Sequence, residues 1–152
     1  KAMLKNANSS EFDEGAEHQV IGLITEWKSS EGAIEKRDDT SDLGGTMRLG
    51  LYAAALKDGS VVQGLYNSKL VEERHRHRYE FNNDYLERFH KAGLITSGIN
   101  PDSNLVEIVE IENHPFFVGV QFHPEYKSTV VNPHPLFQGF VKAAIVATKK
   151  GK

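Results

Sequence analysis

The sequence predicts an α/β fold, and three segments in its C-terminal part give the clearest indication. Residues 105–111 and 116–122 are apolar, β-branched runs separated by the turn-forming residues 112–115, so they are expected to pair as an antiparallel hairpin. Residues 136–148 follow Pro135 and place apolar side chains at helical spacing, which predicts a helix. Because strands and helices do not alternate strictly, the expected sheet is compatible with the second half of a larger one.

The upstream elements are predicted from shorter patterns. Residues 20–24 are apolar and β-branched, which predicts a buried strand, whereas residues 28–42 are polar and charged and are expected to be an exposed loop. Residues 44–51 alternate after two glycines and are expected to be a strand. The stretch 61–66 predicts a short element of undetermined type. The apolar side chains expected on one face of the strand at 44–51 are Met47, Leu49 and Leu51.

A short helix is expected after residues 82–84, which supply N-cap side chains for a helix that ends near Lys91. Gly93 suits the position just beyond this helix, because glycine adopts the left-handed conformation at little cost. The side chains expected to face the core are Tyr85, Leu86 and Phe89.

Length and composition are those of an ordinary globular chain. With 152 residues and a mass of 17.0 kDa, it is one domain or most of one. Eighteen basic residues against 21 acidic ones give a formal charge of −3, which argues against a nucleic-acid-binding domain. The apolar runs are too short to span a membrane, and residues 1–5 lack the apolar core of a signal peptide. We therefore expect a cytoplasmic protein with neither a nucleic-acid nor a membrane partner.

The sequence contains no cysteine. This excludes a disulfide framework, a cysteine-ligated zinc site and an iron–sulfur cluster within the chain. It also excludes a cysteine nucleophile within these 152 residues.

The segment Val-Gly-Val-Gln-Phe-His-Pro-Glu at 118–125 is the strongest candidate for catalysis. Residues two apart point the same way in extended backbone, so Glu125 is expected to approach the imidazole of His123. Such a carboxylate fixes the tautomer of a general base and stabilises its imidazolium form, and Pro124 restricts the backbone of the pair. The alternative is a structural histidine beside a surface acid. A metal site is not supported, because two ligands are too few.

Residues 72–80, Glu-Glu-Arg-His-Arg-His-Arg-Tyr-Glu, form the second candidate. In an extended chain the three arginines share one face, and the two histidines and the tyrosine share the other. Three guanidinium groups on one face repel one another unless an anion or carboxylates lie there. A substrate carboxylate, a phosphate and internal Glu or Asp partners all satisfy this requirement. A solvated charged strand is the alternative, and the flanking glutamates argue against nucleic acid.

Two further segments have weaker patterns. Residues 6–12 combine polar capping residues with one acid, Glu11, which by composition alone is a surface residue. Residues 44–50 lack the Gly-Lys-Ser/Thr ending of a phosphate-binding loop and do not open a helix. Their glycines are therefore expected to allow close backbone packing or a bulge.

Five segments, in this order, give the chain a resemblance to a known family. They are Asn-Ala-Asn-Ser-Ser-Glu-Phe at 6–12, Leu-Ile-Thr-Glu-Trp at 23–27, Asp-Leu-Gly-Gly-Thr-Met-Arg-Leu-Gly at 42–50, Glu-Arg-His-Arg-His-Arg-Tyr-Glu at 73–80 and Gln-Phe-His-Pro-Glu at 121–125. Over nearly its whole length the chain resembles the C-terminal part of the class I glutamine amidotransferase domain of the CTP synthase family. Many class I amidotransferases share the His-Pro-Glu segment, whereas the segments at 42–50 and 73–80 are typical of CTP synthases.

The resemblance implies the C-terminal portion of an amidotransferase domain, with a mixed central sheet flanked by helices and incomplete without its upstream half. In the family this domain hydrolyses L-glutamine, and the released ammonia aminates UTP to CTP in a separate synthetase domain. That reaction uses ATP and Mg²⁺, with GTP as an activator. The parent protein is then expected to be a ligase and a homotetramer, and no cofactor is expected within residues 1–152.

The family's site residues match four positions of this sequence. His123 matches the base that activates a cysteine nucleophile, and Glu125 matches its orienting partner. Glu11 matches the acid that binds glutamine, and Arg78 matches a further glutamine contact. These matches agree with the chemistry of free glutamine, because an acid suits its ammonium group and an arginine suits its carboxylate.

One departure from the family pattern is large. The family's nucleophile lies in a Gly-Ile/Val-Cys-Leu-Gly motif, which this chain lacks. From the place of residues 6–12, the motif is expected shortly before Lys1, and residues 1–5 are expected to end the helix that follows it. The chain is therefore expected to hold the histidine–glutamate pair without the nucleophile, the oxyanion hole or the synthetase domain, and to be inactive alone.

Two other interpretations remain open. The missing cysteine favours a non-catalytic, amidotransferase-like module that binds or regulates a partner. Another class I amidotransferase, making GMP or carbamoyl phosphate, would explain the His-Pro-Glu segment but not the segments at 42–50 and 73–80.

Overall fold

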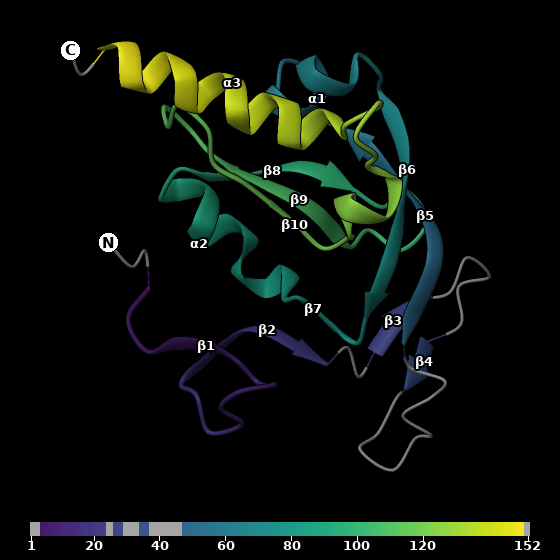
Figure 1. Ribbon diagram of the computed structural model, residues 1–152. Coiled ribbons are helices and arrows are strands. Elements are labelled where there is room, and N and C mark those ends of the chain that lie inside the picture. Colours follow the sequence, from purple (N-terminus) through teal and green to yellow (C-terminus); the bar gives the residue numbers. More distant parts are fainter. Residues whose placement is uncertain (1–3, 24–25, 29–33, 37–46, 151–152) are drawn as a thin grey trace.

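A computed structural model describes residues 4–23, 26–28, 34–36 and 47–150 of the chain (Figure 1). This part of the chain forms three β-sheets and three α-helices, in the α/β class that the sequence predicts. None of the helices found in it is long and apolar enough to cross a membrane.

A five-stranded sheet forms the centre of the fold. Its strand order is β10-β9-β8-β5-β6, and every neighbouring pair is antiparallel. The ladder of β5 and β6 sets Arg48 opposite His77, so these two side chains lie on the same face of the sheet. The strands are β5 (Arg48–Leu56), β6 (Leu70–His77), β8 (Leu94–Ile99), β9 (Val106–Ile111) and β10 (Val118–Val120).

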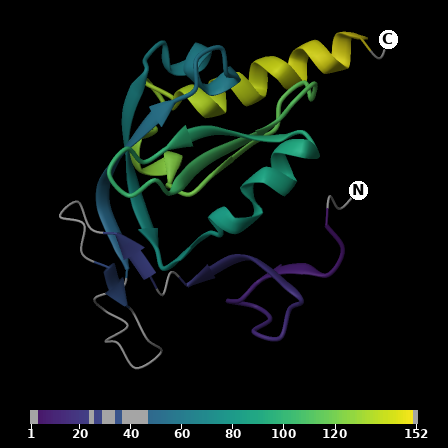
Figure 2. The same ribbon diagram turned by 180° about the vertical axis from the view of Figure 1, so that it is seen from behind.

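Helices lie on both sides of this sheet (Figures 1 and 2). α1 (Val61–Tyr66) and α3 (Pro135–Lys150) lie together on one side of β8–β10, and α2 (Leu86–Lys91) lies on the other. A Cβ atom built on Gly139 of α3 would lie 2.6 Å from a methyl carbon of Leu65 in α1. Glycine at this position therefore lets the Leu65 side chain pack directly against the backbone of α3.

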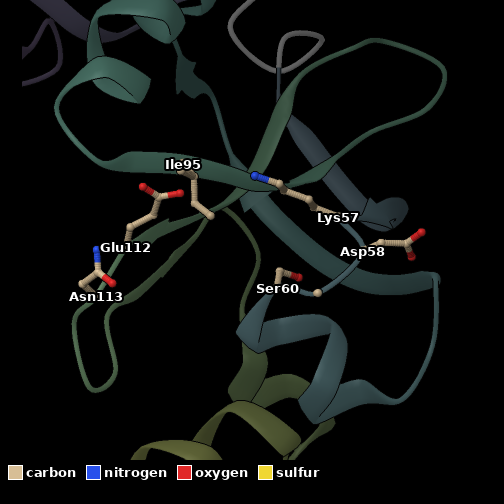
Figure 3. A pocket seen from close by; sticks show the side chains of 7 residues that line it. Lys57, Asp58, Ser60, Ile95, Glu112 and Asn113 are labelled. Atoms are coloured by element: carbon tan, nitrogen blue, oxygen red, sulfur yellow. The ribbon is translucent and has the colours of Figure 1, made fainter.

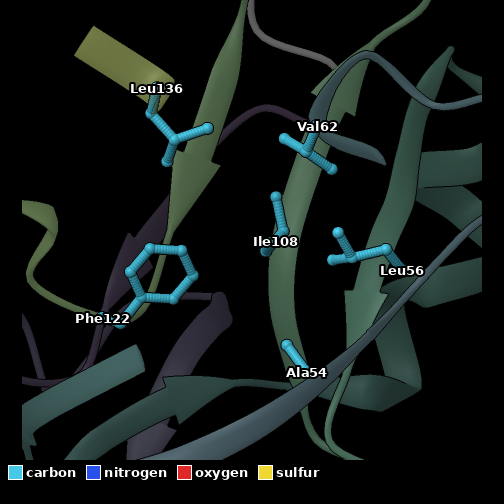
Figure 4. Packing of buried hydrophobic residues seen from close by; sticks show 6 residues of the cluster. All are labelled: Ala54, Leu56, Val62, Ile108, Phe122 and Leu136. Carbon is cyan, nitrogen blue, oxygen red and sulfur yellow. The ribbon is translucent and has the colours of Figure 1, made fainter. Parts of the chain in front are cut away.

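The main hydrophobic core lies between the sheet, α1 and α3 (Figure 4). Ile108 of β9 is at its centre and is 0 % exposed. Burial of such side chains is the main favourable contribution to folding. The other members are Ala54, Leu56, Val62, Phe122 and Leu136.

The N-terminus of α1 is held by a buried acid from the sheet. Glu110 of β9 accepts hydrogen bonds from the backbone N–H groups of Val61 and Val62, each at 3.0 Å. Ser60 completes the cap by accepting from the N–H of Gln63 at 3.2 Å. These bonds satisfy N–H groups that have no partner within the helix.

A second, three-stranded sheet joins the first where β6 ends. Its strands are β1 (Ala7–Ser9), β2 (His18–Leu23) and β7 (Tyr79–Phe81); β1 and β2 are parallel, and β2 and β7 are antiparallel. Only Arg78 separates the end of β6 from the start of β7, so the chain passes from one sheet to the other at that residue. Parallel and antiparallel pairs therefore occur together in the three-stranded sheet, and not in the central five-stranded one.

The predicted loop over residues 28–42 requires a correction. β3 (Glu26–Lys28), at the start of this stretch, pairs as an antiparallel strand with β4 (Ile34–Lys36), which lies within it. Trp27 and Ile34 are residue types that favour strands, and the backbone groups of the two segments satisfy one another. The rest of this stretch lies outside the described residues, as do positions 24 and 44–46 of the two predicted strands and positions 1–3 of the predicted helix end.

The hairpin and the helices predicted near the C-terminus are confirmed. β9 and β10 are antiparallel, with Val120 opposite Ile108, although β10 is shorter than the predicted strand. The last helix begins at Pro135. Asn82 caps the earlier helical segment, which opens with a 3₁₀ turn at Asn83–Tyr85 before α2. Gly93 then has φ of +87°. The aromatic ring of Phe89 contacts the rings of Phe81 and Tyr85, as expected for the inner side of α2.

The apolar face of β5 is on the opposite side from the core. Leu49 and Leu51 share a face as predicted, but they are 67 % and 50 % exposed. The inward face begins instead with Arg48, which is buried because carboxylates surround it. The apolar stripe of α3 is also largely exposed, with Leu136 as its buried member.

Truncation of the central core residue should destabilise the protein. The substitution Ile108→Ala removes methyl groups from a fully buried site and leaves a cavity, so it should lower the free energy of unfolding by about 2–5 kcal/mol in urea titrations. Val130→Ala is the matched control, because Val130 is 98 % exposed and its truncation should change stability by less than about 0.5 kcal/mol. Equal effects of the two substitutions would contradict this description of the core.

Candidate functional site

The imidazole of His123 and the carboxylate of Glu125 form a hydrogen-bonded pair. Nδ1 of His123 lies 2.7 Å from Oε1 of Glu125, as the sequence predicts. Because an ionised carboxylate only accepts, the proton of the neutral ring lies on Nδ1 and leaves Nε2 free to act as a base. The two side chains are 36 % and 55 % exposed, so a substrate or a neighbouring segment can reach them.

The backbone that brings this pair together is a turn rather than the extended chain assumed from the sequence. His123 is extended, with φ of −108° and ψ of 90°, but Pro124 opens a 3₁₀ turn over Pro124–Lys127. Proline suits this first position because its φ is already fixed near the required value. The turn carries the Glu125 side chain back toward the imidazole, and the ring of Tyr126 stacks on it at 4.9 Å between centroids.

The 3₁₀ turn is anchored to strand β6. The N–H of His123 donates to the carbonyl of Arg74 at 2.9 Å. Lys127 donates to the carbonyl of Glu72 and lies 3.8 Å from the carboxylate of Glu73. The histidine–glutamate pair therefore has a fixed place relative to the arginine and histidine residues of β6.

The charge state of Glu125 suits an orienting role. Its own backbone N–H and the imidazole of His123 both hold the pKa of this carboxyl below its ordinary value. The carboxylate is therefore ionised at neutral pH, and it can stabilise a positive charge on the ring.

Glu11 and Arg78 line the same cavity of about 380 Å³. They come from different parts of the chain: Glu11 follows β1, and Arg78 lies between β6 and β7. An acid and a guanidinium in one cavity can hold the ammonium and the carboxylate of an amino acid. The remaining lining residues are Ile21, Met47, Arg76, His77, Tyr79 and Gln121.

His123 is outside this lining, although it is close to one of the lining residues along the chain. Gln121 in the cavity wall is two residues before His123. The N–H of His123 donates to the carbonyl of Arg74 in β6, and the ring of Phe122 lies 5.9 Å from that of His75, so this segment packs against β6. The structure therefore brings Glu11 and Arg78 into one cavity and pairs His123 with Glu125, and Gln121 connects the cavity wall to the segment that carries His123.

A buried arginine, Arg48, lies opposite the cavity residue His77 in the β5–β6 ladder. The guanidinium of Arg48 lies 2.6 Å from Oε1 of Glu107 in β9 and 3.2 Å from Oε1 of Glu80 in β7. It also lies 4.3 Å from the centre of the Tyr52 ring. Burial acts to lower the pKa of Arg48, but the two carboxylates hold it above its ordinary value, so this residue stays cationic.

Two histidines of β6 continue this polar cluster. Nδ1 of His75 lies 2.8 Å from Nε2 of His77, and Nδ1 of His77 lies 3.1 Å from the carbonyl oxygen of Tyr79. Burial lowers the pKa of His75 to about 3 and that of His77 to about 4, and the positive charge of Arg48 adds to both effects. Both rings are therefore neutral at neutral pH.

A second buried acid links β6 to the helices. Glu73 accepts a hydrogen bond from the hydroxyl of Tyr66 in α1 at 2.8 Å, and it lies 3.0 Å from Nε2 of His134 just before α3. Burial acts to raise the pKa of Glu73, but the bonds from His134 and Tyr66 hold it below its ordinary value. Burial and the charge of Glu73 raise the pKa of Tyr66.

Sequence reasoning did not find this set of buried polar residues. It predicted that the arginines at 74, 76 and 78 face one way and the residues at 75, 77 and 79 face the other. The structure confirms this over 74–77, where Arg74 and Arg76 are exposed and His75 and His77 face inward, but the strand ends before Arg78. It did not predict that the internal carboxylates Glu80 and Glu107 would bind Arg48. The only pattern that pointed to them was the acid within each apolar strand, at 80 and 107.

A second cavity, of about 400 Å³, lies away from these residues (Figure 3). The turn before α1 contributes Lys57, Asp58 and Ser60, and Ile95, Glu112 and Asn113 line the opposite side. It shares no lining residue with the first cavity. In the described part of the chain, no group of three His, Cys, Asp or Glu residues is arranged to hold a metal ion.

The family Glutamine amidotransferase class-I matches residues 18–143, which include the histidine–glutamate pair and Arg78. The chain belongs to this family. Among solved structures, the glutaminase domain of Trypanosoma brucei CTPS with bound acivicin matches the chain with a TM-score of 0.76 and 36 % sequence identity. The match covers 92 % of this chain and 51 % of that one, so the chain spans about half the length of the structure that it resembles.

Membership of the class I amidotransferases agrees with the α/β fold. The fold is also similar to that of a CTPS glutaminase domain. The resemblance stated from the five sequence segments is thereby confirmed at the level of the domain.

The two buried histidines should make the stability of this amidotransferase domain fall in acid. Their pKa values of about 3 and about 4 in the folded chain are below the ordinary value of 6.5, so below that pH the unfolded chain takes up protons that the folded chain does not. Stability should be fully present above pH 6.5 and should fall toward pH 4 by ~1 kcal/mol per pH unit for each histidine.

Urea titrations between pH 7 and about pH 4.5 measure this dependence. The double substitution His75→Gln and His77→Gln should flatten the slope, whatever it does to stability at pH 7. An unchanged slope would show that other groups cause the loss of stability in acid.

Proposed function

We propose that this chain supplies the general base, its orienting carboxylate and the substrate-binding residues of a glutaminase site. Glu11 binds the ammonium group of L-glutamine and Arg78 binds its carboxylate, while the side-chain amide extends toward His123. Two observations support this proposal: Glu11 and Arg78 line one cavity, and Gln121 in the same lining is two residues before His123, which is paired with Glu125. The similarity to a glutaminase domain solved with bound acivicin supports the same assignment.

The proposed reaction needs a nucleophile from outside these 152 residues, because the sequence contains no cysteine. Nε2 of His123 takes the proton of a cysteine thiol as the thiolate attacks the amide carbon of glutamine. The imidazolium then returns the proton to the leaving nitrogen, and ammonia departs. Glu125 stabilises the imidazolium throughout, and water hydrolyses the resulting thioester to glutamate.

We further propose that the parent protein is a CTP synthase. In this proposal the ammonia aminates UTP in a synthetase domain that also uses ATP and Mg²⁺, GTP activates the enzyme, and the parent is a homotetrameric cytoplasmic ligase. The donor sets in the described residues do not fit a magnesium site, since they contain no cluster of three suitable ligands. In this proposal the synthetase domain, outside these 152 residues, holds UTP, ATP and Mg²⁺.

A non-catalytic, amidotransferase-like module is the second candidate, and the missing cysteine favours it. The coding sequence upstream of Lys1 separates the two. A Gly-Ile/Val-Cys-Leu-Gly motif there supports the glutaminase, and a native start at Lys1 supports the module.

Loss of the base should remove glutamine hydrolysis in the full-length protein. His123→Ala should lower kcat for glutamate release by at least ~100-fold, the usual scale for removal of a general base. His114→Ala is the matched control, because His114 is an exposed histidine in the β9–β10 turn and its loss should leave kcat unchanged. Undiminished turnover in the His123 variant would refute the proposed function.

Loss of the substrate contacts should mainly affect binding. Glu11→Gln and Arg78→Leu each remove a charged partner of the substrate and should raise the KM for glutamine about 10–100-fold, as expected for loss of a hydrogen bond between charged groups. Glu14→Gln is the control, since Glu14 is an exposed acid in the same loop as Glu11 but lies outside the cavity lining. A change of KM in the Glu14 variant equal to that in the Glu11 variant would argue against a specific contact.

A further inference from the structure

We propose that His77 is a positioning residue of the glutamine site: by donating a hydrogen bond to the carbonyl of Tyr79, it fixes the bend at Arg78 and holds the guanidinium in the cavity. This inference rests on the proposed function, because it concerns the substrate contact of Arg78.

Arg78 lies at the bend between two strands. β6 ends at His77 and β7 begins at Tyr79, and the two strands belong to different sheets. Arg78 is the single residue between them, and it belongs to neither strand. Its side-chain direction therefore depends on interactions that span the bend.

The His77 side chain makes such an interaction. Its Nδ1 lies 3.1 Å from the carbonyl oxygen of Tyr79, two residues along the chain and just beyond the bend. His77 also lines the cavity together with Arg78. A change in the His77–Tyr79 contact thus acts directly on the backbone that presents Arg78.

The hydrogen-bond pattern fixes the tautomers of both buried histidines. A carbonyl oxygen only accepts, so Nδ1 of His77 must carry the proton. Its Nε2 then accepts from Nδ1–H of His75 at 2.8 Å. This arrangement requires a neutral His77, and its pKa of about 4 agrees with that requirement.

Groups from every neighbouring element face the two rings. Arg48 of β5 lies opposite His77 in the ladder, and Oε1 of Glu80 in β7 lies 3.4 Å from its Nδ1. Oε2 of Glu107 in β9 lies 3.6 Å from Nε2 of His75. The cluster is rigidly packed, because His75 and His77 also contact each other ring to ring at 5.1 Å. Positioning of Arg78 is therefore achieved before the substrate arrives.

Two substitutions of equal size separate positioning from packing. Asparagine at 77 keeps an N–H donor where Nδ1 stands, whereas leucine has the same shape without a donor. In the full-length enzyme, His77→Leu should raise the KM for glutamine about 10-fold and change kcat by less than about 3-fold, and His77→Asn should keep both constants within about 3-fold of the original. Equal KM values in the two variants would overturn the proposal, and so would a loss of kcat at constant KM.

Free ammonia bypasses the glutamine site, so ammonia-supported CTP formation is the folding control for both variants. If His77→Leu also loses that activity, the proposal is tested instead by the tautomer of His77 in the unaltered protein. Nitrogen-15 NMR at neutral pH should show the proton on Nδ1, and a proton on Nε2 would overturn the proposal.

The control His90→Leu removes a histidine of α2 that bonds Thr96, away from the cavity, and should leave the KM unchanged. Failure of this inference is distinct from failure of the proposed function. An inactive His123→Ala variant combined with an unchanged KM in His77→Leu refutes only the role of His77.

Discussion

The pairing of the Arg48 guanidinium with Glu80 and Glu107 is the interaction on which the arrangement of the site depends. Arg48 and Glu107 belong to the five-stranded sheet, and Glu80 belongs to the three-stranded one, so the cluster joins the two sheets at their junction. A buried charge without its partner costs several kcal/mol, and removal of Arg48 would leave Glu80 and Glu107 buried without this cation. The two sheets are thereby held in one relative orientation.

The cavity lined by Glu11 and Arg78 lies at the same junction. Residues of β2, of the segment after β1, and of the β6–β7 bend all contribute to its wall. A side chain at the end of a strand keeps its direction only while the strand is held in place. The buried cluster holds the strands, the His75–His77 pair holds the bend, and the anchored 3₁₀ turn holds the His123–Glu125 pair. Each candidate residue is therefore oriented by contacts that belong to the fold itself.

Local patterns in the sequence predicted local features of the structure. The β9–β10 hairpin, the helix behind Pro135 and the cap at Asn82 depend on a few adjacent residues, and they are confirmed. The contact of His123 with Glu125 also spans only two residues, although a turn brings it about. The resemblance to a family supplied the roles of Glu11 and Arg78, since composition alone made Glu11 a surface acid.

Features that depend on residues distant in the sequence were not predicted. The alternating pattern around Glu107 does not identify Arg48 as its partner. Leu49 and Leu51 face outward because Arg48, next to them in β5, faces inward and pairs there with buried carboxylates. Burial of a charge is favourable only with a partner, and the partner is fixed by the tertiary fold. The short β3–β4 pairing was missed because its polar flanks resemble a loop.

The most direct test of the glutaminase site is a crystal structure of the full-length protein with glutamine bound, after the nucleophilic cysteine has been replaced by alanine. The account predicts the ammonium group of glutamine on Glu11, its carboxylate on Arg78 and its side-chain amide facing Nε2 of His123. Glutamine bound elsewhere, or bound in this cavity with its amide directed away from His123, would contradict it.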